Sequence, residues 1–236
     1  RLLGDYLRID TTNPPGNEYL ACDWLEGLLA AEGFVCERYD PGEGRHSLRA
    51  AYAGDGSKRP IILLNHTDVV PAEAERWEQP PFSGAIADGA IWGRGALDMK
   101  GLAVMQLLTM LLFKRHGIAS KRDLVFLATP DEESGGAWGV EWLAREHPEV
   151  MTNAEFVLNE GEYGITGYMG SERPVFGFSP SEKGPYWLHL TVDGTAGYGA
   201  TPLADNCVEA LARACAKIAD WERPYEIREA VRPTWD

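Results

Sequence analysis

The segment Pro60-Ile61-Ile62-Leu63-Leu64-Asn65-His66-Thr67-Asp68 holds the clearest structural signal in this chain. Its apolar residues run without interruption, which is typical of a central strand covered on both faces. Residues 123–128 and 154–158 have the same character, and segments with apolar residues at helical spacing lie between the three strands. Strands alternating with helices indicate the α/β class. We therefore expect a three-layer αβα sandwich with a mostly parallel central sheet.

The flanking segments extend this pattern in both directions. Near Ser179 the character changes, because residues 185–192 alternate between polar and apolar side chains and residues 206–221 have an amphipathic helical pattern. We expect one domain in residues 1–180 and the opening βα unit of a smaller domain in residues 181–236. In the larger domain we further expect helices at 2–9, 19–31, 102–113 and 137–146, strands at 34–39 and 47–52, and irregular backbone at 11–17 and 72–89.

Composition restricts the class of protein. Of 236 residues, 44% are hydrophobic and 25% are charged, which excludes disordered and fibrous classes. The net charge of −14 argues against nucleic acid or an anionic membrane as partner, and it suits a protein that binds cations. No apolar run approaches the roughly 20 residues of a membrane span, and no signal peptide is visible. The four cysteines lack a Cys-x-x-Cys spacing and are typical of reduced thiols, so we expect a cytoplasmic location.

Polar side chains follow each of the three central strands. His66 and Asp68 follow the first strand, Glu132 and Glu133 the second, and Glu160 the third. A further carboxylate, Asp98, directly precedes the apolar helix at 102–113. In an open α/β sheet, ligands bind beyond the carboxyl ends of the strands. Crowded carboxylates resist ionisation unless a cation lies among them, and imidazole with carboxylate oxygens suits zinc, manganese or cobalt.

Each of these residues also has an ordinary structural explanation. His66 could be a buried histidine with satisfied hydrogen bonds, Glu132-Glu133 a solvated loop, Asp98 a helix cap and Glu160 a turn residue. Their joint position at the strand ends of one sheet favours a site. The glycine fingerprint of dinucleotide-binding proteins is absent. A serine hydrolase built on Ser134 and His66 lacks the Gly-x-Ser-x-Gly turn and is a poor second hypothesis.

Five segments, in this order, resemble the motifs of one di-zinc metallopeptidase and amidohydrolase family. Its members include aminoacylase, acetylornithine deacetylase, succinyl-diaminopimelate desuccinylase and glutamate carboxypeptidase. The resemblance runs from the start of the chain to about Ala212. The segments are Ile9-Asp10-Thr11-Thr12-Asn13-Pro14-Pro15-Gly16-Asn17-Glu18, Asn65-His66-Thr67-Asp68-Val69-Val70-Pro71, Gly93-Arg94-Gly95-Ala96-Leu97-Asp98-Met99-Lys100-Gly101, Asp131-Glu132-Glu133-Ser134-Gly135-Gly136 and Asn159-Glu160-Gly161.

The resemblance implies roles for the site residues. His66 and Glu160 would bind one zinc ion and Glu133 the other, while Asp98 would bridge both ions. Asp68 would orient His66, and Glu132 would act as the general base. The implied cofactors are two zinc ions, with cobalt or manganese as possible replacements. Residues 1–180 would then be the catalytic domain, and residues 181–236 the first part of an inserted αβ lid that often dimerises.

Two departures from the family pattern affect the expected activity. The family takes another metal ligand from a histidine near the C-terminus, after the lid, and this chain ends inside the lid. We therefore expect a catalytic domain without its C-terminal part, and a piece that is inactive alone. Tyr198 stands where the family usually has a substrate-binding histidine. Its hydroxyl can donate a hydrogen bond but cannot carry the imidazolium charge.

These observations predict metal-dependent hydrolysis of an amide bond in N-acyl amino acids or small peptides. A two-metal site would activate water, with Glu132 as general base. The expected partners are a small-molecule substrate and a second copy of the chain through the lid, with neither nucleic acid nor membrane. The alternative is a catalytically impaired homologue that still binds metal or ligand, which Tyr198 favours.

Overall fold

The computed structural model describes residues 1–161, 164–177, 179, 184, 187–201, 204–224, 226, 227, 229 and 232. The chain divides into two compact units, Arg1–Gly161 and Glu162–Asp236. The central sheet and all candidate metal ligands belong to the first unit, whereas Tyr198 belongs to the second. The predicted division into a catalytic domain and a lid at residue 180 remains a prediction.

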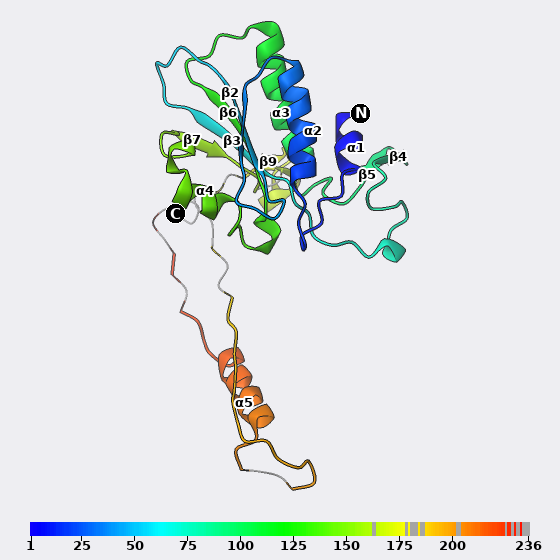
Figure 1. Ribbon diagram of the computed structural model, residues 1–236, viewed down its shortest axis with the longest axis vertical. Helices are drawn as coiled ribbons and strands as arrows, with labels where there is room; N and C mark the ends of the chain where they lie inside the picture. The colour runs from blue at the N-terminus through cyan, green and yellow to red at the C-terminus, as the bar shows by residue number, and fades with distance from the viewer. Residues whose placement is uncertain are drawn as a thin grey trace. The chain divides into compact units, whose positions relative to one another are not determined.

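A five-stranded sheet forms the centre of the first unit, in the order β1-β2-β6-β3-β7. Its middle strands β6 and β3 run parallel, as do β3 and β7, whereas β1 and β2 extend the sheet antiparallel. Figure 1 shows β2, β6, β3 and β7 together at the centre of the first unit. The predicted α/β class with a mostly parallel central sheet is confirmed. The strand bounds are Cys36–Tyr39 (β1), Ser47–Tyr52 (β2), Ile61–His66 (β3), Leu124–Thr129 (β6) and Phe156–Leu158 (β7).

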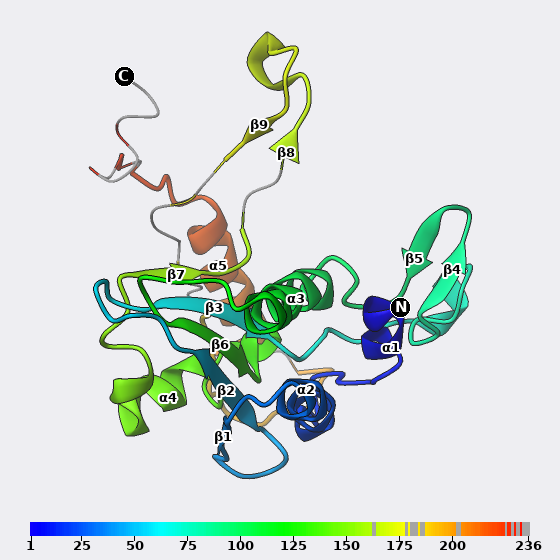
Figure 2. The ribbon, with the colours of Figure 1, turned by 90° about the horizontal axis from the view of Figure 1, so that it is seen from above.

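Helices cover both faces of this sheet, so the first unit has three layers (Figure 2). One face packs against α1 (Leu2–Leu7), α2 (Tyr19–Ala31) and α3 (Lys100–His116). The other face packs against α4 (Val140–Glu146) and the 3-10 turn η3 (Pro148–Val150). Side chains alternate along the strands, so neighbouring residues such as Ile62 and Leu63 enter opposite cores. This alternation explains why the central strands are apolar throughout.

Gln106 is a buried polar residue in the middle of the largely apolar helix α3. Its Nε2 donates to the carbonyl oxygens of Leu64 at 3.0 Å and Leu158 at 3.3 Å, and its Oε1 accepts from Asn65 Nδ2 at 2.9 Å. One buried side chain therefore links α3 to both β3 and β7. This link holds the carboxyl ends of two strands against the helix that follows Asp98.

Two sequence-based expectations for the first unit are wrong in part. Strand β7 lies at the edge of the sheet, and Phe156, Val157 and Leu158 are each more than half exposed, so β7 is not covered on both faces. Residues 72–89 are not wholly irregular, because β4 (Ala85–Ala87) pairs with β5 (Ala90–Trp92) after the 3-10 turn η1 (Ala74–Arg76). The hairpin turn is Asp88-Gly89, and both residues have positive φ, which suits the right-handed twist of a two-residue hairpin.

The described residues of the second unit include a short hairpin and the helix α5 (Cys207–Ala219). Strand β8 (Gly164–Ile165) pairs with β9 (Val175–Phe176) across the 3-10 turn η4 (Tyr168–Gly170). The predicted helix is confirmed as α5 (Cys207–Ala219), and Asn206 caps it by accepting from the backbone N–H of Val208 at 3.0 Å. The predicted strand at 185–192 is wrong for its described part, since residues 187–192 adopt no regular structure. A strand requires a hydrogen-bonded neighbour, and the described residues supply none there.

Two further properties concern the described part of the chain. None of its helices combines the length and the apolar character that a bilayer span requires. The four cysteines are all free, with Cys22 buried and Cys215 exposed.

Candidate metal centre

Five side chains predicted to form a site lie at the carboxyl ends of the parallel strands. His66 is the last residue of β3, and Glu132 and Glu133 begin η2 (Glu132–Ser134), the 3-10 turn that follows β6. Glu160 lies just after β7, and Asp98 lies in the loop before α3. Segments far apart in the sequence therefore supply one set of donors.

The structure brings these side chains into two groups that share His66. One group is His66, Asp98 and Glu133, and the other is His66, Glu132 and Glu160; within each group the donor atoms all lie within 4.8 Å of one another. His66 Nε2 lies 2.9 Å from Asp98 Oδ1 and 3.4 Å from Glu160 Oε1. The His66 side chain is 2% exposed and that of Asp98 is 64% exposed. The centre is thus anchored in the fold at one side and open to solvent at the other.

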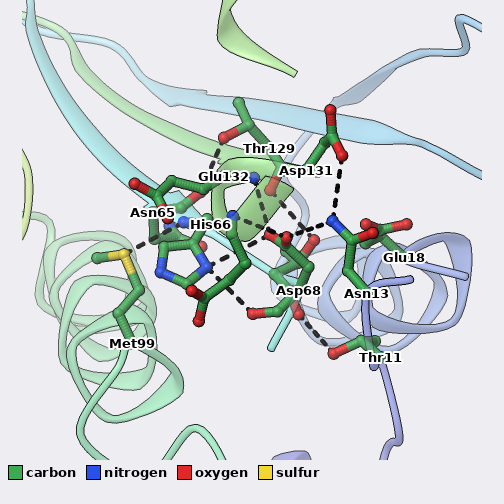
Figure 3. Close-up of polar contacts among 12 residues, drawn as sticks. Thr11, Asn13, Glu18, Asn65, His66, Asp68, Met99, Thr129, Asp131 and Glu132 are labelled. Carbon is green, nitrogen blue, oxygen red and sulfur yellow. Dashed lines mark hydrogen bonds and ion pairs between the residues drawn. The ribbon is translucent and has the colours of Figure 1, made fainter. Parts of the chain in front are cut away.

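Asp68 connects His66 to the turn that carries the two glutamates (Figure 3). His66 Nδ1 lies 3.1 Å from the carbonyl oxygen of Asp68 and 3.4 Å from its Oδ1. Asp68 Oδ1 accepts from the backbone N–H of Glu132 at 3.2 Å, and Oδ2 accepts from that of Glu133 at 3.1 Å. Burial opposes the ionisation of Asp68, but hydrogen bonds from His66 and Asn13 keep its pKa below the usual range.

The backbone at Asp131 directs the two following carboxylates. Asp131 has a φ of +70°, in the left-handed region, and η2 begins with the next residue. Its own side chain is buried, and Oδ2 accepts from the backbone N–H of Trp138 at 3.0 Å. Three consecutive acidic residues therefore separate: Asp131 points into the fold, while Glu132 and Glu133 reach the centre.

Negative charge dominates the electrostatics of the centre. Burial by itself lowers the pKa of His66, but hydrogen bonds with three neighbouring carboxylates outweigh burial and raise that pKa to about 12. In return, the hydrogen bond from His66 lowers the pKa of Asp98. The surroundings of His66 Nε2 therefore strongly favour a cation.

The two adjacent glutamates have raised pKa values, in contrast to Asp98. Desolvation raises the pKa of Glu132, and desolvation together with the charge of Asp98 raises the pKa of Glu133 to about 7. Carboxyl groups that resist ionisation indicate a shortage of positive charge, which a divalent cation would supply. Imidazole nitrogen with carboxylate oxygens is a donor set that suits zinc, manganese or cobalt, so these residues fit such an ion.

Tyr198 lies in the second unit. It is 79% exposed, so its ring does not pack beneath α5. The hydroxyl group is therefore available to a ligand, and its role remains a prediction.

The structure also reveals polar residues that sequence reasoning missed. Asn13, Glu18 and Arg45 are buried, and Arg45 donates to both Glu18 and Asn13. Asn13 in turn donates to the acidic residues Asp68 and Asp131 (Figure 3). The sequence placed Asn13 and Glu18 in a segment that resembles a family motif, but it gave neither residue a role. Arg45 carried no signal at all, because a lone basic residue in a loop is normally solvated.

Imidazole and carboxylate donors thus gather at the strand ends of a three-layer α/β fold. This combination defines a candidate metalloprotein. Residues 62–233 match the profile of the peptidase family M20/M25/M40, and the chain belongs to this family. The resemblance stated from the sequence motifs is thereby confirmed.

Relatives and solved structures agree with this assignment. Aminoacylase-1 of Sus scrofa is 34% identical over 212 residues, which are 89% of this chain and 50% of that protein. An N-fatty-acyl-amino acid synthase/hydrolase of Mus musculus is 34% identical over 173 residues, 72% of this chain and 34% of that protein. The chain thus spans about half the length of these relatives, or less.

Two solved structures share the fold. Human carnosine dipeptidase 1 has a TM-score of 0.59 at 20% identity, over 70% of this chain and 39% of that chain. The family M20 metallo-carboxypeptidase Sso-CP2 of Sulfolobus solfataricus has a TM-score of 0.59 at 22% identity, over 71% of this chain and 38% of that chain. At this identity the likeness shows the fold alone.

Proposed function

We propose that this chain forms the metal-binding catalytic part of a hydrolase that cleaves an amide bond in N-acyl amino acids or small peptides. The observation that carries the proposal is the pair of donor groups that meet at His66 on the strand ends of the sheet. The names of the relatives support the reaction class, because they describe an aminoacylase and an N-fatty-acyl-amino acid hydrolase.

The proposed ligand set divides the donors between two ions. His66 and Glu160 hold one ion, Glu133 holds the other, and Asp98 is shared by both. The separation of 2.9 Å between His66 Nε2 and Asp98 Oδ1 supports this, because atoms so close together can face one ion without rearrangement of the backbone. We propose zinc as the ion, with cobalt or manganese as substitutes.

Glu132 is the proposed general base. A bound metal pair would polarise the substrate carbonyl and make water more acidic. Glu132 takes a proton from that water, the water oxygen bonds to the carbonyl carbon, and the carbon–nitrogen bond breaks. Glu132 then passes the proton to the leaving amine, so the products are a carboxylic acid and an amine. Its raised pKa supports this role, because a base works best with a pKa near the working pH.

The test is hydrolysis of N-acetyl amino acids by the full-length protein before and after chelation. We expect turnover to disappear with a chelator and to return with zinc or cobalt. A serine-directed reagent should leave the rate unchanged, because the ring nitrogens of His66 contact carboxylates and a carbonyl rather than Ser134. Metal binding without turnover of any acyl amino acid or dipeptide would instead support the impaired homologue.

Tyr198 and the second unit complete the proposal. We propose that the exposed hydroxyl of Tyr198 donates a hydrogen bond to the substrate, and that residues 181–236 mediate a homodimer in the cytoplasm. Tyr198→Phe should then reduce kcat/KM by the loss of one hydrogen bond to developing charge, about 2–4 kcal/mol. Sedimentation of the full-length protein tests the dimer.

A further inference from the structure

We propose that Asn13 and Arg45 are positioning residues of the metal centre. They hold Asp68 and Asp131 in place, and through these two carboxylates they fix the turn that carries Glu132 and Glu133. The proposal rests on the function proposed above, since it concerns the same donors, but neither residue reaches the donors themselves.

The amide of Asn13 joins three charged side chains. Its Oδ1 accepts from Arg45 Nη2 at 3.0 Å. Its Nδ2 donates to Asp68 Oδ2 at 2.9 Å and to Asp131 Oδ1 at 3.1 Å (Figure 3). Because the oxygen must face the guanidinium and both N–H bonds must face carboxylates, Arg45 fixes which way the amide points. Asn13 is 2% exposed, so water does not compete for these bonds.

Arg45 supplies the positive charge of this cluster. Its Nη1 lies 2.7 Å from Glu18 Oε1 and 3.5 Å from Asp131 Oδ1. The side chains are nearly inaccessible, at 9% exposed for Arg45, 0% for Glu18 and 4% for Asp131. Removing the cation from such a group leaves buried carboxylates without compensation, which is strongly unfavourable. Asp131 would then turn toward other donors or toward water.

The backbone delivers Asn13 to this place by pairing with the segment after β3. Asn13 N–H donates to the carbonyl oxygen of Val69 at 2.9 Å, and Thr11 Oγ1 donates to that of Thr67 at 2.6 Å. Gly16 leaves the space that the guanidinium fills, since a Cβ there would lie 2.1 Å from Arg45 Cζ. Thr11 and Asn13 of the loop 11–17 are thus packed against the centre, whereas Pro14 and Pro15 are exposed.

Loss of Asn13 or Arg45 would alter metal binding through the turn that carries Glu132 and Glu133. Asp68 receives the backbone N–H groups of both glutamates, and Asp131 sets the left-handed backbone from which they start. If Asn13 no longer holds the two carboxylates, Glu132 and Glu133 lose their fixed separation. Outer groups that orient metal ligands typically affect metal affinity by about 10–100-fold.

The experiment titrates the metal-free protein with Co²⁺ at neutral pH and compares wild type with Asn13→Ala and Arg45→Met. We expect both variants to bind Co²⁺ roughly 10–100-fold more weakly. Arg49→Met is the matched control, because Arg49 Nη1 lies 2.8 Å from Glu37 Oε2 in an ion pair on β1 and β2 without contact to this cluster. It should bind Co²⁺ like wild type. Hydrogen exchange of the metal-free protein should accelerate over residues 131–138 in Asn13→Ala and stay unchanged in Arg49→Met.

The outcomes separate the two proposals. If wild type binds no Co²⁺, the proposed function fails and this inference fails with it. If wild type binds Co²⁺ and folded Asn13→Ala binds it equally well, the positioning role alone is refuted. Asn13→Ala decides even if Arg45→Met fails to fold, because it leaves the ion pair between Arg45 and Glu18 in place. Recovery of Co²⁺ affinity in Arg45→Met by the added change Asp131→Asn would support the charge argument, and a further loss would contradict it.

Discussion

Replacing Asp68 by asparagine tests the most connected residue of the centre with the smallest change of shape. The carboxylate faces only donors: Asn13 Nδ2 at 2.9 Å, Glu133 N at 3.1 Å, Glu132 N at 3.2 Å and His66 Nδ1 at 3.4 Å. An amide has one oxygen and one NH₂ group. Whichever way the new amide turns, its NH₂ group meets donors of the protein.

The expected loss of stability follows from the less harmful of the two orientations of the new amide. With its oxygen at the position of Oδ2, the amide keeps the bonds from Asn13 and Glu133 and places its NH₂ group against Glu132 N and His66 Nδ1. The lost bond to Glu132 costs about 1–3 kcal/mol. Loss of the charge weakens the two remaining bonds, by roughly 1 kcal/mol together. We expect the free energy of unfolding to fall by about 2–4 kcal/mol.

The same change should weaken metal binding for a separate reason. An NH₂ group beside His66 Nδ1 no longer accepts from that nitrogen, so the ring is held less firmly with Nε2 toward Asp98 and Glu160. Outer groups that orient a ligating histidine typically change metal affinity by about 10–100-fold, so Co²⁺ affinity should fall by that amount.

Urea unfolding of the metal-free protein and Co²⁺ titration measure the two effects. Asp10→Asn is the control, since the exposed Asp10 accepts, among the described residues, from Thr12 alone, at 3.0 Å and 2.6 Å. It should change stability by less than about 0.5 kcal/mol. A stable Asp68→Asn variant with unchanged Co²⁺ affinity would refute the reasoning.

Three further changes test other parts of the argument. Glu132→Gln should retain the bound metal and lower kcat by ~10²–10⁴-fold; loss of one metal equivalent would make Glu132 a ligand. Gly16→Ala should destabilise the chain by about 1–3 kcal/mol in urea unfolding, because φ is +85° and the new Cβ meets Arg45. Burial raises the pKa of the Cys22 thiol to about 12, so a thiol reagent at pH 8 should modify the exposed Cys215 and spare Cys22 in the folded protein. Above about pH 8.5 the unfolded chain loses this proton while the folded chain keeps it, so stability should fall with rising pH, and less steeply in Cys22→Ala.

The local sequence was sufficient for most of the elements and for the choice of candidate donors. The helix α2 and the strand β2 occur at the predicted residues, because apolar spacing reflects one buried face in each. The donors could be named because parallel strands end at a common edge, where His66 and Glu160 meet. These inferences require only the period of a strand or a helix and the direction of the chain.

Contacts between distant segments lay beyond such reasoning. Asn13 meets Asp131 across 118 positions of sequence, and no local pattern relates the two residues. The exposure of β7 depends on which strand lies next to it, and that is a property of the whole sheet. Alternation at 185–192 likewise indicated a strand, but pairing decides whether a strand forms.

The four carboxylates that meet at the turn after β6, those of Asp68, Asp131, Glu132 and Glu133, are of two kinds. Asp68 and Asp131 are buried and accept hydrogen bonds from backbone N–H groups and from Asn13, so their lone pairs are engaged by the protein. Among the residues that the structure describes, no hydrogen bond reaches the carboxylates of Glu132 and Glu133, and both have raised pKa values. The carboxylate oxygens of Glu132 and Glu133 therefore have free lone pairs and lack a positive neighbour. Such oxygens can bind a metal ion or accept a proton. The left-handed backbone at Asp131 places this division between adjacent residues, so one acidic run supplies both a buried support and two candidate site carboxylates.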